Sequence, residues 1–258
     1  MIERISVYCC SWGVTQAVVN GILHLGQLDF DPDFLFILSG QDYPIKSNDE
    51  IQAYLADHQG QQFMEIFPLP YKGWGRYDGM RRFESFHFWI RGKHLVYPPF
   101  SVRQHPTPLM KTVQRLFPHK KRTIPGDLAP YGGSSSVTLG GNAFAYVYDL
   151  LRQPLGEQLL RFFKRTNISD ELFLQTLIGN SPLKDTIIGH SLVSIDWSAG
   201  GPHPKIYSED DFDTLIHTQD RLFARKFDIQ VDARILDMLD QHCEPSVPEP
   251  STQFVIAE

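Results

Sequence analysis

A continuous apolar run at Phe34 to Leu38 constrains the fold more than any other part of this sequence. Consecutive Phe, Leu and Ile residues are typical of a strand that is buried on both faces of a parallel sheet. Helical spacing of apolar residues precedes the run at 16–25, and a well-capped helix is predicted after it at 47–57. A third strand is expected at 62–67. This alternation predicts an α/β fold, with helices packed on a parallel sheet.

Further elements are predicted on both sides of this region. A short strand is expected at 5–10, while a stretch rich in Pro, Gly and aromatic residues fits a hairpin at 86–96 and a helix at 108–117. Helices are then predicted at 142–151, 155–165, 169–178, 210–217 and 231–242, with a strand at 192–197. No internal repeat or linker interrupts the body, so we expect one domain at 1–243 and a Pro- and Ser-rich, disordered tail at 244–258.

Composition narrows the classes of function. The 258 residues are 42% hydrophobic, which is enough for a sizeable core. Lys and Arg number 24 against 30 Asp and Glu, and the net charge of −6 excludes a nucleic-acid binder held by bulk positive charge, although a local phosphate pocket is allowed. No apolar run reaches the roughly 18 residues of a membrane span. Three cysteines, two of them adjacent, and an N-terminus without a signal-peptide layout predict a reducing, cytoplasmic location.

Common catalytic motifs are missing from the sequence. There is no P-loop, and Gly73 to Gly79 has one residue too many for a dinucleotide-binding fingerprint. Ser134 to Ser136 lacks the final glycine of a nucleophile elbow, and the ten histidines show no zinc-binding spacing. The acid-x-acid triplet Asp31 to Asp33 precedes its strand instead of following it. Residue patterns alone therefore indicate an α/β enzyme-like domain of unknown chemistry.

Four groups of residues between Tyr8 and His242 carry a more specific signal in their order along the chain. They are Tyr8 to Gln16; Phe34 to Ser47; Gly132 to Ser134 with Ser169 to Thr176; and Ile195 to Trp197 with His203 to Lys205 and Leu222 to Phe227. Together they resemble the core-2/I-branching β-1,6-N-acetylglucosaminyltransferases and the related peptide O-xylosyltransferases. The resemblance covers most of the chain.

The resemblance implies a GT-A-like fold, that of nucleotide-diphospho-sugar transferases, with a mostly parallel sheet flanked by helices. It implies inverting transfer of N-acetylglucosamine or xylose from a UDP-sugar to a hydroxyl group of a carbohydrate or glycopeptide acceptor. The donor is then a cosubstrate, and no metal ion or other cofactor is expected. The lack of a carboxylate pair at a strand end agrees with metal-free chemistry.

One departure from the family concerns the start of the chain. Family members usually carry a further βαβ-sized stretch, roughly 30 residues or more, ahead of the segment that matches Tyr8, and it helps form the nucleotide pocket. Here Met1 stands almost at the second unit, so either the start is truncated or the uridine site is incomplete. The alternative to an enzyme is therefore a carbohydrate-binding pseudoenzyme that has lost donor binding. Another donor sugar on the same scaffold is a second alternative.

Within this resemblance, Glu171 matches the family's general base. Inverting transfer needs a carboxylate that takes the proton of the acceptor hydroxyl while its oxygen attacks the sugar carbon opposite UDP. A place in the first turn of the predicted helix at 169–178, where the helix dipole favours an ionised acid, agrees with that role. Acids also gather in first turns for stability alone. Asp170 is interpreted mainly as a helix cap, with substrate contact as its other role.

Three cations are candidates for the UDP diphosphate, whose growing charge needs fixed positive groups when no metal is present. Lys226 matches the family's position for such a cation, and Arg225 stands beside it. Neighbouring residues of an extended segment face opposite ways, so we expect only one of them, Lys226, to point inward. Lys205 is expected as the second cation because of its place after Trp197. For each lysine the alternative is an ordinary surface charge.

The remaining candidates are substrate and donor contacts. Trp197 offers an indole face for a sugar, although a tryptophan that ends a strand is otherwise a core residue. Arg82 resembles an acceptor-contacting cation of the family, and Ser134 belongs to the segment similar to its acceptor region. Asp42 follows a predicted strand, where ligands of open sheets bind, but its side chain could equally fix the turn before Pro44.

Overall fold

The computed structural model describes Ile5, Val7 and residues 10–28, 31–90, 93–97, 122–201 and 203–244. The chain divides into two compact units, each built from two separate stretches. Unit 1 comprises Met1–Ile37 with Gly60–Ser191, and unit 2 comprises Leu38–Gln59 with Leu192–Glu258. The single domain expected at 1–243 stays a prediction.

Unit 1 contains a mixed four-stranded sheet. Its strands are β1 (Phe34–Ile37), β8 (Val137–Gly140), β3 (Gln62–Phe63) and β9 (Ile187–Ile188), in the order β1-β8-β3-β9. The strand β8 runs antiparallel to both β1 and β3, and only β3 and β9 are parallel.

The α/β class is confirmed, but the predicted mostly parallel sheet is wrong for the described strands, where β3/β9 in unit 1 and β10/β11 in unit 2 are the parallel pairs. An apolar run reports burial and carries no information on the direction of a neighbour. The partner of β1 comes about a hundred residues later and runs the other way. As an edge strand of the described sheet, β1 is also only half-buried, not buried on both faces.

Two antiparallel ribbons complete the strands described in unit 1. One pairs β4 (Ile66–Pro68) with β7 (Tyr131–Gly133), and the other is the hairpin of β5 (Phe86–Ile90) and β6 (Lys93–Tyr97). The predicted hairpin is therefore confirmed. The single strand predicted at 62–67 is divided between β3 and β4, and these belong to different sheets.

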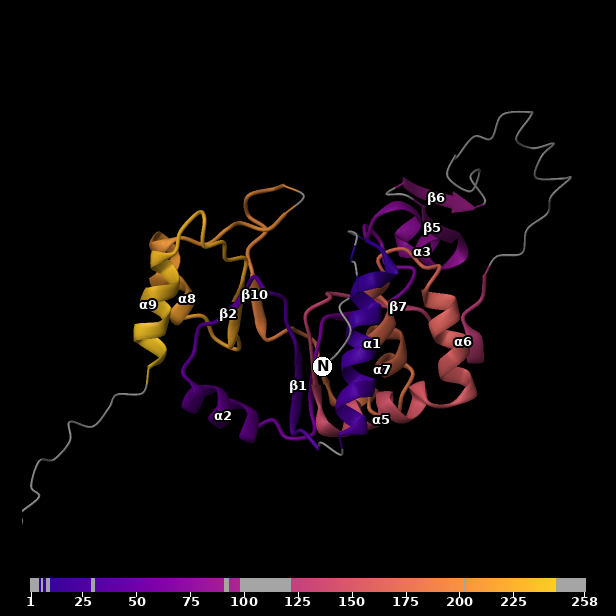
Figure 1. Cartoon of the computed structure of the whole chain (residues 1–258), viewed down its shortest axis with the longest axis horizontal. Helices are drawn as coiled ribbons and strands as arrows, with labels where there is room; N and C mark the ends of the chain where they lie inside the picture. The colour runs from indigo at the N-terminus through magenta and orange to yellow at the C-terminus, as the bar shows by residue number, and fades with distance from the viewer. Residues whose placement is uncertain are drawn as a thin grey trace, which may run out of the picture. The chain divides into compact units, whose positions relative to one another are not determined.

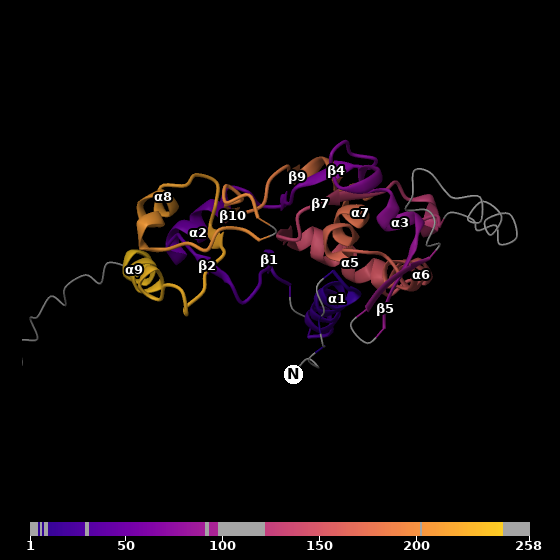
Figure 2. The same cartoon turned by 90° about the horizontal axis from the view of Figure 1, so that it is seen from above.

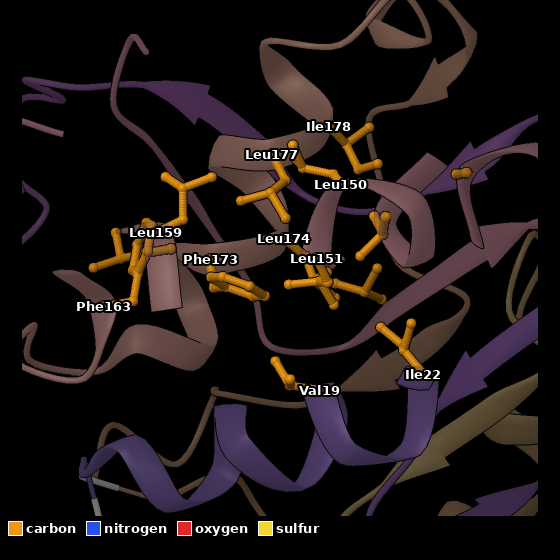
Figure 3. Packing of buried hydrophobic residues seen from close by; sticks show 14 of the residues in the cluster. Val19, Ile22, Leu150, Leu151, Leu159, Phe163, Phe173, Leu174, Leu177 and Ile178 are labelled. Atoms are coloured by element: carbon orange, nitrogen blue, oxygen red, sulfur yellow. The ribbon is translucent and has the colours of Figure 1, made fainter. Parts of the chain in front are cut away.

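Helices pack together in unit 1 around one apolar core. They are α1 (Trp12–Gln27), α3 (Arg81–Glu84), α5 (Gly141–Leu151), α6 (Pro154–Phe163) and α7 (Phe173–Gly179). Both views show α1, α5 and α7 side by side (Figures 1 and 2). Figure 3 shows Val19 and Ile22 of α1 pointing toward the side chains of α5 and α7. The rings of Phe163 and Phe173 meet edge to face, with centroids 5.1 Å apart.

Burial in this core fixes the segment that precedes α7. Leu172 is fully buried and Phe173 is 1% exposed. Each such side chain contributes about 1.5–3 kcal/mol when it leaves water. The anchored residues lie next to Glu171, so the core determines where that carboxylate stands.

Unit 2 is smaller and has its own core. Its elements are β2 (Asp42–Pro44), α2 (Asn48–Ala56), β10 (Val193–Ile195), α8 (Phe212–Ile216), β11 (Phe223–Arg225) and α9 (Arg234–Cys243). The sheet order is β10-β11-β2, with β10 parallel and β2 antiparallel to β11. Ser47 and Glu50 form a complete capping box at the start of α2, as their spacing predicted. Ile45, Ala224 and Ile235 are among the fully buried apolar residues of the core of unit 2.

Most predicted helices are observed, with shifted ends. The exception is the helix expected at 169–178, where a 3₁₀ turn at Ser169–Glu171 precedes α7. The predicted helix at 108–117, most of the strand at 5–10 and the tail after Glu244 lie outside the described residues. Among the helices of the described ranges, none combines the length and the apolarity needed to cross a membrane.

Candidate active site

The main candidate base, Glu171, stands in a tight turn and not in the first turn of an α-helix. Ile168 enters the turn in the left-handed region, with φ 51°, and Leu172 leaves it with φ −132° before α7 begins. Ser169 ties the turn to α1 through a hydrogen bond of 2.7 Å to the hydroxyl of Thr15. The predicted place of Glu171 in the first turn of an α-helix is therefore wrong, because α7 starts only at Phe173.

Arg82 of α3 is the direct partner of Glu171. Its Nη1 donates a hydrogen bond to Glu171 Oε2 at 2.7 Å, within an ion pair whose side chains are 18% and 33% exposed. The guanidinium carbon of Arg82 also lies over the indole of Trp74, 3.8 Å from the ring centroid. The structure thus joins two predicted site residues that are 89 positions apart.

The surroundings make the Glu171 carboxyl hold its proton more tightly than a free one. Burial is the chief cause that raises its pKa, the carboxylates of Asp170 and Glu65 add to the rise, and the Arg82 guanidinium works against it. Such a carboxylate is a stronger base once it is ionised, which suits removal of a proton from a hydroxyl group. Because the Arg82 guanidinium favours the ionised form of Glu171, it limits the rise in the pKa of this carboxyl.

Asp170 does not cap the helix, contrary to the sequence interpretation. Leu172 occupies the N-cap position of α7, with no side-chain cap hydrogen bond. Oδ1 of Asp170 is buried and finds no hydrogen-bond partner within the described residues. Burial raises the pKa of this carboxyl as well. Two adjacent carboxyl groups are therefore held in a poorly solvated place.

Ser134 follows β7 and is tied to the same helix as the turn. Its carbonyl accepts a hydrogen bond of 2.6 Å from Nε2 of Gln175, which lies in α7. Its own hydroxyl accepts from the backbone N–H of Ser136 at 3.3 Å. The segments that resemble the acceptor region of the family, at 132–134 and 169–176, thus meet in unit 1.

The other candidate cations belong to unit 2, and two of them are already engaged. Arg225 of β11 lies 3.5 Å from Asp42 Oδ1 and donates a hydrogen bond of 2.6 Å to the Ser39 hydroxyl. Asp42, whose side chain is 2% exposed, also accepts from the backbone N–H of Ser39. The turn-fixing role left open for Asp42 is thereby observed, while donor contact stays a prediction.

Lys205 and Lys226 differ in whether their ammonium groups are paired with a carboxylate. The Lys205 ammonium donates to Asp211 Oδ1 at 2.6 Å, in a salt bridge that raises its pKa. Lys226 is a half-buried residue, and its ammonium makes no ion pair or hydrogen bond within the described part of the chain. Of the three cations, Lys226 is therefore the one that a new anion could engage without displacing a described carboxylate.

Trp197 follows β10 and is 57% exposed, so the alternative of a core residue is wrong. A strand end was expected to bury the ring, but the chain turns away into a loop in which the N–H of Gly200 donates to the Trp197 carbonyl at 3.1 Å. Its indole face is thereby open to a ligand.

Two residues of the Glu171 surroundings were missed by the sequence analysis. Trp74 lies in the Gly73 to Gly79 segment, which sequence reasoning tested only as a nucleotide fingerprint. Glu65 is an exposed residue between β3 and β4. Its only signal was its place ahead of the aromatic-rich stretch. In the ranges that the structure describes, no group of three or more His, Cys, Asp or Glu side chains could hold a metal ion.

Comparison with known proteins decides the family. The family model described as Core-2/I-Branching enzyme matches residues 1–217. The chain belongs to the Core-2/I-Branching enzyme family. The matched range includes Arg82, Ser134 and Glu171, whereas Arg225 and Lys226 lie beyond it.

Curated relatives of this family member are glycosyltransferases by name. Xylosyltransferase 2 of Rattus norvegicus is 24% identical over 234 residues, which cover 84% of this chain and 24% of the relative. Xylosyltransferase 2 of Mus musculus is 25% identical over 238 residues, with 85% and 24% covered, and Xylosyltransferase 1 of Mus musculus is 24% identical over 242 residues, with 87% and 22% covered. The chain spans about a quarter of the length of these relatives.

Proposed function

We propose that this chain is a metal-independent, inverting glycosyltransferase that moves a sugar from a UDP-sugar to a hydroxyl group of a carbohydrate or peptide acceptor. The observation that carries the proposal is the Glu171 carboxylate, which is paired with Arg82 in a chain of the Core-2/I-Branching family. The names of the relatives favour xylose over N-acetylglucosamine as the transferred sugar. A GT-A-like architecture is part of the proposal and rests on the family.

In this mechanism Glu171 acts as the general base. Arg82 engages Oε2, while Oε1 has no hydrogen-bond partner within the described residues and is the oxygen we assign to the acceptor hydroxyl. The hydroxyl oxygen attacks the anomeric carbon from the face opposite UDP, its proton passes to Glu171, and the bond from sugar to diphosphate breaks with inversion. A fixed cation, Lys226 in this proposal, offsets the negative charge that develops on the leaving diphosphate.

The test replaces Glu171 by Gln, which keeps shape and hydrogen-bonding reach but cannot accept a full proton. Release of UDP from UDP-xylose and UDP-N-acetylglucosamine is measured with water as the substitute acceptor. Turnover should fall by roughly 10²–10⁴-fold, the usual weight of general-base catalysis. Donor binding, followed by calorimetry, should stay near that of the parent chain.

Asp170→Asn is the matched control, because it removes a neighbouring carboxylate of similar burial. If Asp170→Asn is inactive while Glu171→Gln hydrolyses donor normally, the base has been assigned to the wrong carboxylate. If the parent chain binds carbohydrate but neither donor is bound or hydrolysed, the pseudoenzyme alternative replaces the proposal.

A reducing, cytoplasmic location completes the proposal. It is supported by the cysteine content of the sequence, since three cysteines, two of them adjacent, do not suit a disulfide framework. Cell fractionation checks it, and recovery of the chain from an oxidising compartment would contradict it.

A further inference from the structure

Trp74 connects the Arg82–Glu171 ion pair to the folded body of unit 1. One side of its indole supports the Arg82 guanidinium at 3.8 Å. Its ring meets that of Phe67 in β4 edge to face, with centroids 5.0 Å apart. Phe67 in turn stacks on Tyr71 at 4.3 Å. The indole therefore lies between a strand of the β4–β7 ribbon and the cation that contacts Glu171.

Two glycines leave the space that the indole occupies. A Cβ atom at Gly132 would lie 2.6 Å from Cη2 and Cζ3 of Trp74, and one at Gly79 would lie 2.5 Å from Cε3. Gly79 also has φ 84°, a conformation that favours glycine. Gly132 belongs to the Gly132 to Ser134 segment that the sequence analysis associated with the acceptor region. The structure gives a physical reason for that glycine, which is close approach by the ring of Trp74.

We propose that Trp74 is a positioning residue, whose indole holds the Arg82 guanidinium against Oε2 of Glu171 and so leaves the second carboxylate oxygen for the acceptor. Stacking on an aromatic face fixes the plane of a guanidinium, and a fixed plane directs its N–H groups. Without the ring, the Arg82 side chain gains freedom and the 2.7 Å contact is held less of the time. The role as base rests on the proposed function, whereas the contact itself does not.

The charged groups around Glu171 allow the positioning role of Trp74 to be measured through the pKa of the Glu171 carboxyl. The groups that act on its carboxyl are Arg82, which favours the ionised form, and Asp170 and Glu65, which oppose it along with burial. Loosening Arg82 leaves the opposing influences in place. The carboxyl should then ionise at higher pH.

The experiment follows the carboxyl carbon of Glu171 by ¹³C NMR during a pH titration of the whole chain. Trp74→Leu should move the titration midpoint to higher pH, and Trp74→Phe, which keeps an aromatic face, should recover most of the change. Tyr71→Leu is the matched control, because it removes a neighbouring ring that does not contact Arg82, and it should leave the midpoint in place. An unchanged or lower midpoint in Trp74→Leu would overturn the proposal.

A second pair of variants tests whether Trp74 acts through Arg82. Arg82→Gln should raise the midpoint by itself, and adding Trp74→Leu to Arg82→Gln should raise it no further. A further rise in the double variant would mean that the indole influences Glu171 directly, which contradicts the positioning role. Both variants are compared by the titration of the same Glu171 carbon. A variant that fails to fold is recognised separately, because unfolding changes signals throughout the spectrum.

Kinetics separate this inference from the proposed function. If the chain hydrolyses UDP-xylose, Trp74→Leu should slow the reaction about threefold to tenfold on the acidic limb of the pH profile, with a smaller loss toward the plateau. If the chain hydrolyses no donor, the proposed function fails, but the titration of Glu171 still decides the role of Trp74.

Discussion

Gly133→Ala tests the ribbon that frames the candidate site. Gly133 pairs with Ile66 across the β4–β7 ribbon. A Cβ atom there would lie 1.8 Å from the carbonyl oxygen of Glu65 and 3.1 Å from Cγ of Gln175. The nearest obstacle is backbone, which cannot rotate away as a side chain can. The substitution must therefore push β4 and β7 apart.

The expected cost follows from two contributions. Overpacking of a filled site costs about 1–3 kcal/mol, and each ribbon hydrogen bond that is lost removes about 0.5–1.5 kcal/mol. The lower chain entropy of alanine in the unfolded state returns about 0.4–1 kcal/mol. With one ribbon hydrogen bond lost, the net loss in the free energy of unfolding should be about 0.5–4 kcal/mol, measured by urea denaturation with Gly133→Ala and the parent chain in parallel.

Gly21→Ala in α1 is the matched control. Apart from its chain neighbours and the backbone of its own helix, no atom of the described residues lies within 4 Å of a Cβ built at Gly21. Alanine in a helix interior is favoured over glycine by about 0.5–1 kcal/mol. The two substitutions add the same methyl group and should change stability in opposite directions. A Gly133→Ala chain as stable as its parent would refute the close approach of the Glu65 carbonyl.

Two further predictions concern the donor and pH. Lys226→Ala should weaken UDP binding by about 1.5–3 kcal/mol without changing uridine binding, and a chelator should change neither. Equal losses for both ligands, or a strict need for manganese, would contradict the assignment of the diphosphate charge to this lysine. Burial is the chief cause that lowers the pKa of His87 to about 4 in the folded chain. Between about pH 6.5 and pH 4, the unfolded chain therefore binds a proton at this histidine and the folded chain does not. Stability should fall by at most about 3 kcal/mol between pH 6.5 and pH 4, a dependence that His87→Phe should reduce.

Local signals in the sequence predicted local structure well. The helix at α2 was recognisable because Ser47 and Glu50 satisfy the free N–H groups of its first turn. The β5–β6 hairpin pairs residues close in sequence, so it could be predicted within a single aromatic-rich stretch. Strand direction could not be predicted in this way, since β1 pairs with β8, which lies about a hundred residues away.

The start of α7, which lies close to Glu171, could not be predicted from the sequence. Asp170 and Glu171 precede an apolar helical pattern, which favours a first helical turn. Ile168 instead begins a 3₁₀ turn in the left-handed conformation, and the irregular Leu172 separates this turn from α7. Burial is the chief influence on the Glu171 carboxyl and raises its pKa, whereas the helix dipole considered from the sequence would favour the ionised form.

Arg82 was expected to contact the acceptor, and its pairing with Glu171 does not exclude that role. A guanidinium has five N–H donors, and the contact described to Glu171 uses Nη1 alone. The indole of Trp74 lies against the guanidinium carbon, while the N–H groups of a guanidinium point outward within its plane. The remaining donors can bind an acceptor oxygen while Nη1 holds Glu171. One cation could then orient the base and the attacking hydroxyl together, which a lysine, with its single ammonium, cannot do in the same planar geometry.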